Sequence, residues 1–306
     1  MVIAAAVILI VFIWSAFLIG YREDEKELHS DESKVFDPRC RSIEIERGND
    51  RAVLFIHGFP TTPDMYRYSA GIASEAGYDV FAPLIPSFGA DYRDFAKTNF
   101  SSWYRWIEDY YNEKRRNYRY FYVVGVSMGG ALTLKLAENN RDITAMAVFS
   151  APVVYNSLIR DRIITNPAGY IARIIALFTP FIAPRCLTGH KGNNDGDDEW
   201  IGYGGQFPRQ GVSIMHNLKA IRKRLPDIRT PVFLLHDKGD RTVPFANLAI
   251  IDREIGSEKK KTMTSSMDRR YRHTHHSLLM YHSCREKNTY DILDFFKEVE
   301  DELKTH

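Results

Sequence analysis

The sequence predicts an α/β fold with a mostly parallel central sheet and helices on both faces. Short apolar runs that suit buried strands alternate with helix-like segments along residues 42–149. Parallel strands need long crossover connections, and this alternation supplies them. The composition agrees, because a chain of 306 residues with 44% hydrophobic and 26% charged residues is typical of a globular protein.

The individual elements follow from the spacing of apolar residues. A run such as AVLFI at residues 52–56 has no polar residue, which is typical of a strand buried on both faces. The expected strands cover residues 42–46, 52–56, 78–82, 120–126, 145–149 and 232–236. The expected helices cover residues 65–75, 100–116, 128–139, 170–178 and 287–303.

The N-terminal residues 1–20 predict a transmembrane anchor. Residues 2–19 carry no charge, and 18 residues rising about 1.5 Å each extend roughly 27 Å, close to a hydrocarbon core of about 30 Å. A cleaved secretory signal is the alternative, but no Lys or Arg precedes the run and the cleavage site is poor. We expect a single-pass membrane protein with a polar linker over residues 21–38 and a folded domain over residues 39–306. The side of the membrane stays open.

The alternation of strands and helices breaks between residues 153 and 210, which predicts an insertion that covers a site as a cap. An apolar stripe runs along its expected helix, at Ile171, Ile174, Ile175 and Phe178. We expect this stripe to pack against the domain, with a lipid or acyl-chain surface as the alternative. A polar, acidic loop follows at residues 189–198.

Charge and cysteine content exclude several classes of function. The formal net charge of +2 gives no reason to expect a nucleic-acid partner, and the basic clusters at residues 259–261 and 269–272 predict a solvated face. Cys40, Cys186 and Cys284 lie far apart and none belongs to a C-x-x-C pair. We therefore expect no metal site and no redox motif.

The strongest local motif is G-x-S-x-G at residues 125–129, between an expected strand and an expected helix. A serine on a tight, strained turn projects its hydroxyl above the sheet, and glycines two positions away leave room for the turn. Ser127 is therefore the expected nucleophile. The backbone N–H groups of Phe59 and Met128 are the expected oxyanion-hole donors, because Pro60 has no N–H. His57 is expected to support this loop.

Three motifs together carry a family resemblance: LFIHGF at residues 54–59, GVSMGG at 125–130 and DRTVP at 240–244. With them, the chain resembles the bacterial carboxylesterase and monoacylglycerol lipase group of the α/β-hydrolase superfamily over about residues 50–300. The resemblance implies the α/β-hydrolase fold, a Ser-Asp-His triad and no cofactor. It also implies a serine hydrolase that cleaves short or medium acyl esters or monoacylglycerol.

The acid and the base of the triad are less sharply defined by the sequence. Asp240 matches the family's acid and follows the strand at residues 232–236, with Asp237 as the alternative. The base must follow the acid along the chain. The segment THHSLL at residues 274–279 resembles the family's histidine segment, so His276 is the expected base and His275 the alternative. Tyr281 stands where the family usually has a carboxylate.

The same motifs leave other functions open. A thioesterase, an acyltransferase or a peptidase can use the same nucleophile turn, so the motif does not separate them from an esterase. A non-catalytic binding module could also keep the fold. The retained serine, acid and histidine favour an enzyme over a binding module.

Overall fold

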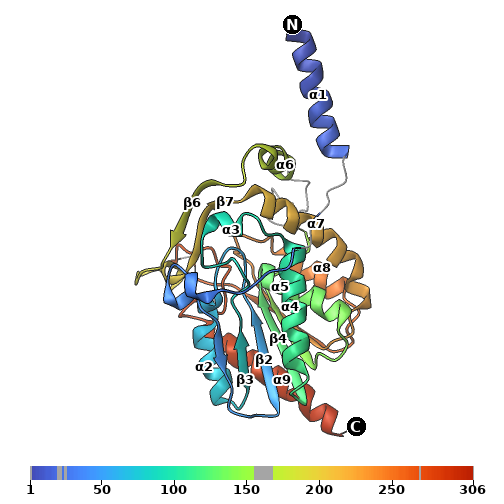
Figure 1. Cartoon of the computed structure of the whole chain (residues 1–306). Coiled ribbons are helices and arrows are strands. Elements are labelled where there is room, and N and C mark those ends of the chain that lie inside the picture. The colour runs from blue at the N-terminus through green and yellow to red at the C-terminus, as the bar shows by residue number, and fades with distance from the viewer. Residues whose placement is uncertain (1, 19–22, 24–25, 155–167, 269, 306) are drawn as a thin grey trace.

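A seven-stranded sheet forms the centre of the computed structural model (Figure 1). The structure describes residues 2–18, 23, 26–154, 168–268 and 270–305. The strand order is β1-β3-β2-β4-β5-β8-β9, and all neighbouring pairs are parallel except β1 with β3. The strands are β1 (Ile43–Ile45), β2 (Arg51–Ile56), β3 (Asp79–Ala82), β4 (Tyr120–Val126), β5 (Ala145–Phe149), β8 (Val232–Asp237) and β9 (Lys260–Ser265). The predicted α/β architecture is confirmed.

Helices cover both faces of the sheet, and each face has its own apolar core. One core packs α4, α5, α7 and α8 against the sheet, and the other packs α2 and α9 against the opposite face. The helices of the domain are α2 (Arg67–Glu75), α3 (Tyr92–Phe95), α4 (Phe100–Arg115), α5 (Met128–Asn139), α7 (Pro208–Arg224), α8 (Ala246–Glu254) and α9 (Arg285–Thr305). Short 3-10 helices are η1 (Glu32–Lys34), η2 (Pro38–Cys40), η3 (Pro63–Tyr66), η4 (Asp197–Glu199) and η5 (Leu225–Asp227).

The edge strand β9 is a feature that the sequence analysis missed. The basic run at residues 259–261 is partly exposed to solvent, as expected, and Lys260 and Lys261 also begin this strand, which pairs in parallel with β8. Its residues alternate between exposed and partly buried. A charged edge strand resists pairing with other chains, which accounts for lysines at this position.

The predicted cap insertion contains α6 (Ala168–Phe178) and a two-stranded antiparallel sheet of β6 (Ile182–Leu187) and β7 (Gly202–Gln206). Residues 155–167 lie outside the described residues. The expected packing of the apolar stripe is only partly correct. Ile174 and Ile175 are partly buried, whereas Ile171 is 54% exposed and Phe178 is 74% exposed.

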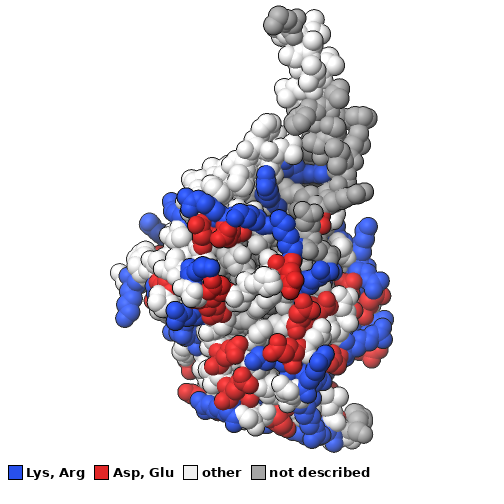
Figure 2. All heavy atoms as spheres, in the orientation of Figure 1, with Lys and Arg blue, Asp and Glu red and all other residues white. Residues whose placement is uncertain are grey.

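The N-terminal segment forms a single helix where the structure describes it. Helix α1 (Val2–Leu18) extends away from the domain (Figure 1), and its described part is free of charged side chains, whereas the visible face of the domain mixes both signs (Figure 2). Nowhere in the described part of the chain is a helix both long enough and apolar enough to cross a membrane. The transmembrane prediction for residues 1–20 is therefore not supported.

The predicted linker over residues 21–38 packs against the domain where it is described. The carboxylate of Glu23 accepts a hydrogen bond from Asn217 at 3.1 Å and also contacts the hydroxyls of Ser101 and Ser213. The N–H of Phe36 donates to the carbonyl of Gly89 at 2.8 Å. These bonds attach the described part of the segment to the α/β body. Cys40, Cys186 and Cys284 are all free.

Candidate active site

Ser127 lies on a strained turn between β4 and α5. Its backbone has φ 59° and ψ −124°, outside the regions that a serine ordinarily adopts, at a cost on the order of 1–3 kcal/mol. Its N–H donates to the carbonyl of Phe149 at 2.9 Å, and the residue is partly exposed. The turn therefore presents the serine at the carboxyl end of the central strands.

Two glycines make this turn sterically possible. A Cβ on Gly125 would lie 2.2 Å from the carbonyl oxygen of Gly129, and a Cβ on Gly129 would lie 1.9 Å from the carbonyl oxygen of Ile56. Both positions lack space for any side chain, as the motif predicts. The second contact also shows that the first turn of α5 lies directly against the end of β2.

The loop after β2 contacts the nucleophile turn. A Cβ on Gly58 would lie 3.3 Å from the Cβ of Ser127 and 3.2 Å from the carbonyl oxygen of Val126. Phe59 is the next residue of this loop. Met128 is the first residue of α5, so its N–H belongs to the group of N–H donors that have no acceptor within the helix. The two expected oxyanion donors thus come from adjacent segments.

His57 holds this loop in place as a neutral side chain. It is fully buried, its Nε2 accepts the N–H of Ile85 at 3.1 Å, and its Nδ1 donates to the carbonyl of Gly58 at 3.0 Å. Burial lowers the pKa of His57 to about 4, so the ring is uncharged near neutral pH. The expectation that His57 supports the loop is confirmed.

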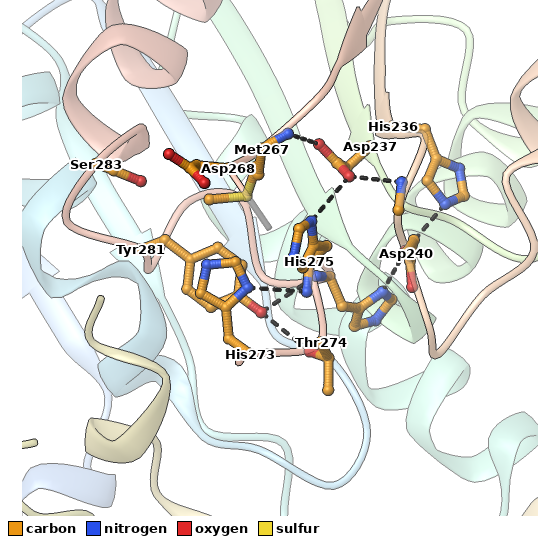
Figure 3. A network of polar contacts seen from close by, with 12 residues as sticks. His236, Asp237, Asp240, Met267, Asp268, His273, Thr274, His275, Tyr281 and Ser283 are labelled. Carbon is orange, nitrogen blue, oxygen red and sulfur yellow. Dashed lines mark hydrogen bonds and ion pairs between the residues drawn. The ribbon is translucent and has the colours of Figure 1, made fainter. Parts of the chain in front are cut away.

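The carboxylate of Asp240 accepts four hydrogen bonds. Oδ1 accepts the N–H groups of Thr242 at 2.7 Å and Val243 at 2.9 Å. Oδ2 lies 2.7 Å from Nδ1 of His276 and 2.9 Å from Nε2 of His236, and Figure 3 shows His236 pointing toward Asp240. Burial alone would raise the pKa of Asp240. The two histidines outweigh burial and hold this pKa well below its usual range, so the carboxylate is ionised.

His276 has the arrangement of a general base. Its Nδ1 donates to the carboxylate of Asp240, which fixes the tautomer and leaves the lone pair on Nε2. That Nε2 is buried and has no hydrogen-bond partner among the described residues. The imidazole can therefore accept a proton at Nε2 while the carboxylate stabilises the resulting charge.

The alternative acid and the alternative base pair with each other. Asp237 is fully buried, and its carboxylate lies 3.2 Å from Nδ1 of His275 (Figure 3). The same carboxylate accepts the N–H of Gly239 at 2.7 Å and the N–H of Met267 at 2.8 Å. Asp237 therefore connects the loop segments that contain Gly239, Met267 and His275 at the end of β8.

A stack of rings supports the histidine loop. The hydroxyl of Tyr281 accepts the N–H of His276 at 3.1 Å and pairs with Oγ1 of Thr274 at 3.0 Å. The ring of Tyr281 stacks on His273 with centroids 4.0 Å apart (Figure 3), and Nε2 of His273 lies 3.3 Å from a carboxylate oxygen of Asp195. The acidic loop of the cap insertion is thus attached to the loop that carries His276.

Sequence reasoning assigned no supporting role to three residues that the structure places around the site. His236 contacts the candidate acid, Tyr281 contacts the backbone of the candidate base, and the Tyr66 hydroxyl donates to the carbonyl of Ile56 at 2.7 Å and accepts the N–H of Val126 at 3.0 Å. His236 lies four residues before Asp240, across the end of β8, and no sequence pattern marks the contact between them. The described residues contain no group of three or more metal-ligating side chains that could hold a metal ion.

The structure combines a parallel sheet covered on both faces with a serine on a strained turn between a strand and a helix. This combination defines a class of α/β proteins in which that turn presents a nucleophile at the carboxyl end of the sheet. The sequence matches the alpha/beta hydrolase family over residues 53–285. The chain belongs to this family.

Similar proteins agree with this assignment. The chain is 38% identical over 101 residues to the thermostable monoacylglycerol lipase of Bacillus sp. (strain H-257), covering 33% of this chain and 40% of that protein. It is 31% identical over 91 residues to the carboxylesterase of Bacillus subtilis (strain 168), covering 29% and 37%. The matches thus span about two fifths of each relative's length.

Solved structures share the fold. A structure reported for LipS and LipT, two metagenome-derived lipolytic enzymes, aligns with a TM-score of 0.71 at 20% identity, covering 85% of this chain and 98% of that chain. The monoacylglycerol lipase of Paleococcus ferrophilus aligns with a TM-score of 0.64 at 16% identity, covering 84% and 98%. At these identities the likeness concerns the fold.

Proposed function

We propose that this protein is a serine hydrolase that cleaves carboxylic esters through an acyl-enzyme on Ser127. The observation that carries the proposal is the Asp240–His276 pair at 2.7 Å, with the second imidazole nitrogen buried and unpartnered among the described residues. A serine held at a strained turn supplies the hydroxyl that such a base can activate.

The sheet order supports a triad of Ser127, His276 and Asp240. Ser127 follows β4 and Asp240 follows β8, and β5 is the one strand between them. Neighbouring strands lie about 4.8 Å apart, so two strand spacings separate the serine from the acid by roughly 10 Å. The imidazole of His276, bonded to the acid, would lie between the two and bridge part of that distance.

The chemistry would proceed in two acyl transfers. Ser127 attacks the ester carbonyl as His276 takes the hydroxyl proton, and the tetrahedral oxyanion accepts the N–H groups of Phe59 and Met128. His276 then gives its proton to the departing alcohol, which leaves the acyl group on the serine oxygen. A water molecule attacks that acyl group in the same way and releases the carboxylic acid.

Lipid esters are the substrate class we propose. The relatives are named a monoacylglycerol lipase and a carboxylesterase, and the cap insertion exposes Ile171 and Phe178 to solvent. A panel of p-nitrophenyl esters of increasing acyl length, with a monoacylglycerol included, would define the preferred chain. A thioester and a peptide substrate tested beside them would separate an esterase from a thioesterase or a peptidase.

A fluorophosphonate probe tests the nucleophile. We expect the full chain to be labelled and Ser127→Ala to lose both labelling and ester turnover. Ser150→Ala is the matched control, because Ser150 follows β5 at φ 47° and its Oγ has no hydrogen-bond partner among the described residues. Labelling that persists in Ser127→Ala, or folded protein that the probe does not label, would overturn the proposal.

A further inference from the structure

His236 is a buried histidine that the proposed reaction does not use directly. It is the penultimate residue of β8 and 1% exposed. Its Nε2 lies 2.9 Å from Oδ2 of Asp240 and 3.2 Å from the carbonyl oxygen of Val243. A strand interior ordinarily holds apolar side chains, so a histidine here needs a physical reason.

The protonation of Nε2 follows from its neighbours. Both atoms that face it, a carboxylate oxygen and a carbonyl oxygen, can only accept hydrogen bonds. Nε2 therefore carries a hydrogen, and His236 donates to Asp240. Oδ2 of Asp240 receives two imidazole N–H groups at once, from His236 and from His276.

We propose that His236 is a positioning residue that fixes the carboxylate of Asp240 for the base His276. This inference rests on the proposed function. The backbone N–H groups of Thr242 and Val243 hold Oδ1, but they leave Oδ2 free to move about that anchor. The bond from His236 fixes Oδ2, which in turn fixes the imidazole that must meet the serine.

The position of the base matters because proton transfer requires hydrogen-bond distance. A misplacement of about 1 Å can lower turnover about 10²-fold. The His236 bond comes from β8, a strand paired on both sides within the sheet, whereas His276 lies on a loop. The sheet therefore fixes the position of the carboxylate of Asp240, and this carboxylate fixes the position of the imidazole of His276.

Three substitutions at one position test this role. His236→Gln keeps an amide nitrogen at about the reach of Nε2, with two hydrogens for Asp240 and Val243. His236→Asn has the same chemistry but is one methylene shorter, and His236→Leu has no donor. We expect Gln to retain kcat within about threefold, and Asn and Leu to lower kcat about 10-fold to 100-fold. KM should change little in all three, because His236 does not touch the substrate.

The measurements are kcat and KM on a short p-nitrophenyl ester, the fluorophosphonate labelling rate and the urea unfolding midpoint. If His236→Leu does not fold, the comparison of Gln with Asn decides the question. Wild-type kcat in Asn and Leu would overturn the inference. Failure of Gln to restore kcat would also overturn it, because ring packing and not the donor would then matter. A wild-type protein that is not labelled would instead overturn the proposed function.

Discussion

Replacing Asp240 by asparagine should leave the fold in place and remove most of the turnover. The carboxylate accepts hydrogen bonds from two backbone N–H groups, those of Thr242 and Val243, and faces two imidazoles, those of His236 and His276. An asparagine offers an oxygen to two of these four groups and an NH₂ to the other two. Since a backbone N–H cannot become an acceptor, the NH₂ must face the histidines.

The consequence falls on the tautomer of His276. Its Nδ1 can accept from the asparagine NH₂ only if the ring hydrogen moves to Nε2. A ring with hydrogen on Nε2 cannot take the proton of Ser127. The corresponding substitution in a serine protease lowers kcat about 10⁴-fold, which at about 1.36 kcal/mol per factor of ten is roughly 5 kcal/mol. We expect a fall of the same order here.

The assay compares kcat and KM on p-nitrophenyl acetate with the urea unfolding midpoint. Asp237→Asn is the matched control, because Asp237 is also a buried carboxylate that faces a histidine. We expect Asp237→Asn to lower the midpoint and to keep turnover per folded molecule within about tenfold, since Asp237 supports loops. Folded Asp240→Asn that turns over within tenfold of wild type would refute the tautomer argument.

Three further predictions concern the loops around the site. His276→Ala should lose about 10³-fold or more in kcat on a short ester, and His275→Ala less than about tenfold; the reverse result would exchange their roles. His57 has a pKa of about 4 in the folded chain, whereas an unfolded histidine has a pKa of about 6.5. Between these pH values the unfolded chain therefore binds more protons at His57 than the folded chain does. The wild type should therefore lose about 3 kcal/mol of unfolding free energy as the pH falls from about 6.5 to 4. Urea unfolding of the wild type and of His57→Gln at pH 7.5 and at pH 4.5 measures this loss, which we expect to be smaller in His57→Gln. Equal losses in the two proteins would contradict the prediction. Tyr281→Phe leaves the buried N–H of His276 without its acceptor and should cost about 1–3 kcal/mol in urea unfolding; an unchanged midpoint would show that the bond is not important.

The sequence predicted the central strands because they are apolar along their whole length. β4 (YFYVVGV) is buried at every residue, so no alternation was needed to recognise it. β9 (KKTMTS) was missed because an edge strand is defined by pairing with its neighbour and not by burial. β6 and β7 were missed because they lie outside the main sheet, pairing with each other and, through Gly202, with Thr61, and because their residues are mixed in polarity.

The candidate site was predictable where it depends on local geometry. The turn at Ser127 needs its glycines wherever it occurs, so a five-residue motif between an expected strand and an expected helix predicts it. The acid and the base depend on which loops meet in space, and the sequence offers two consistent pairings. Asp237 with His275 and Asp240 with His276 both occur in the structure.

One backbone angle separates these two pairings. His275 has φ 58°, so the chain turns between the two histidines and sends each ring to a different carboxylate. Such a conformation is rare for a residue with a side chain and is not visible in a sequence. The family resemblance selected His276 as the base. The backbone conformation of His275 explains why the ring of His275 faces Asp237 and not Asp240.

The contacts of the histidine loop extend the site into the cap insertion. The N–H of His276 donates to Tyr281, the ring of Tyr281 stacks on His273, and His273 faces the carboxylate of Asp195. Asp195 also accepts the N–H of Ser283 at 2.8 Å. Because Asp195 belongs to the acidic loop at residues 189–198, part of the insertion packs onto the loop that carries the proposed base. A change in the position of this acidic loop would therefore act on His276 through these contacts.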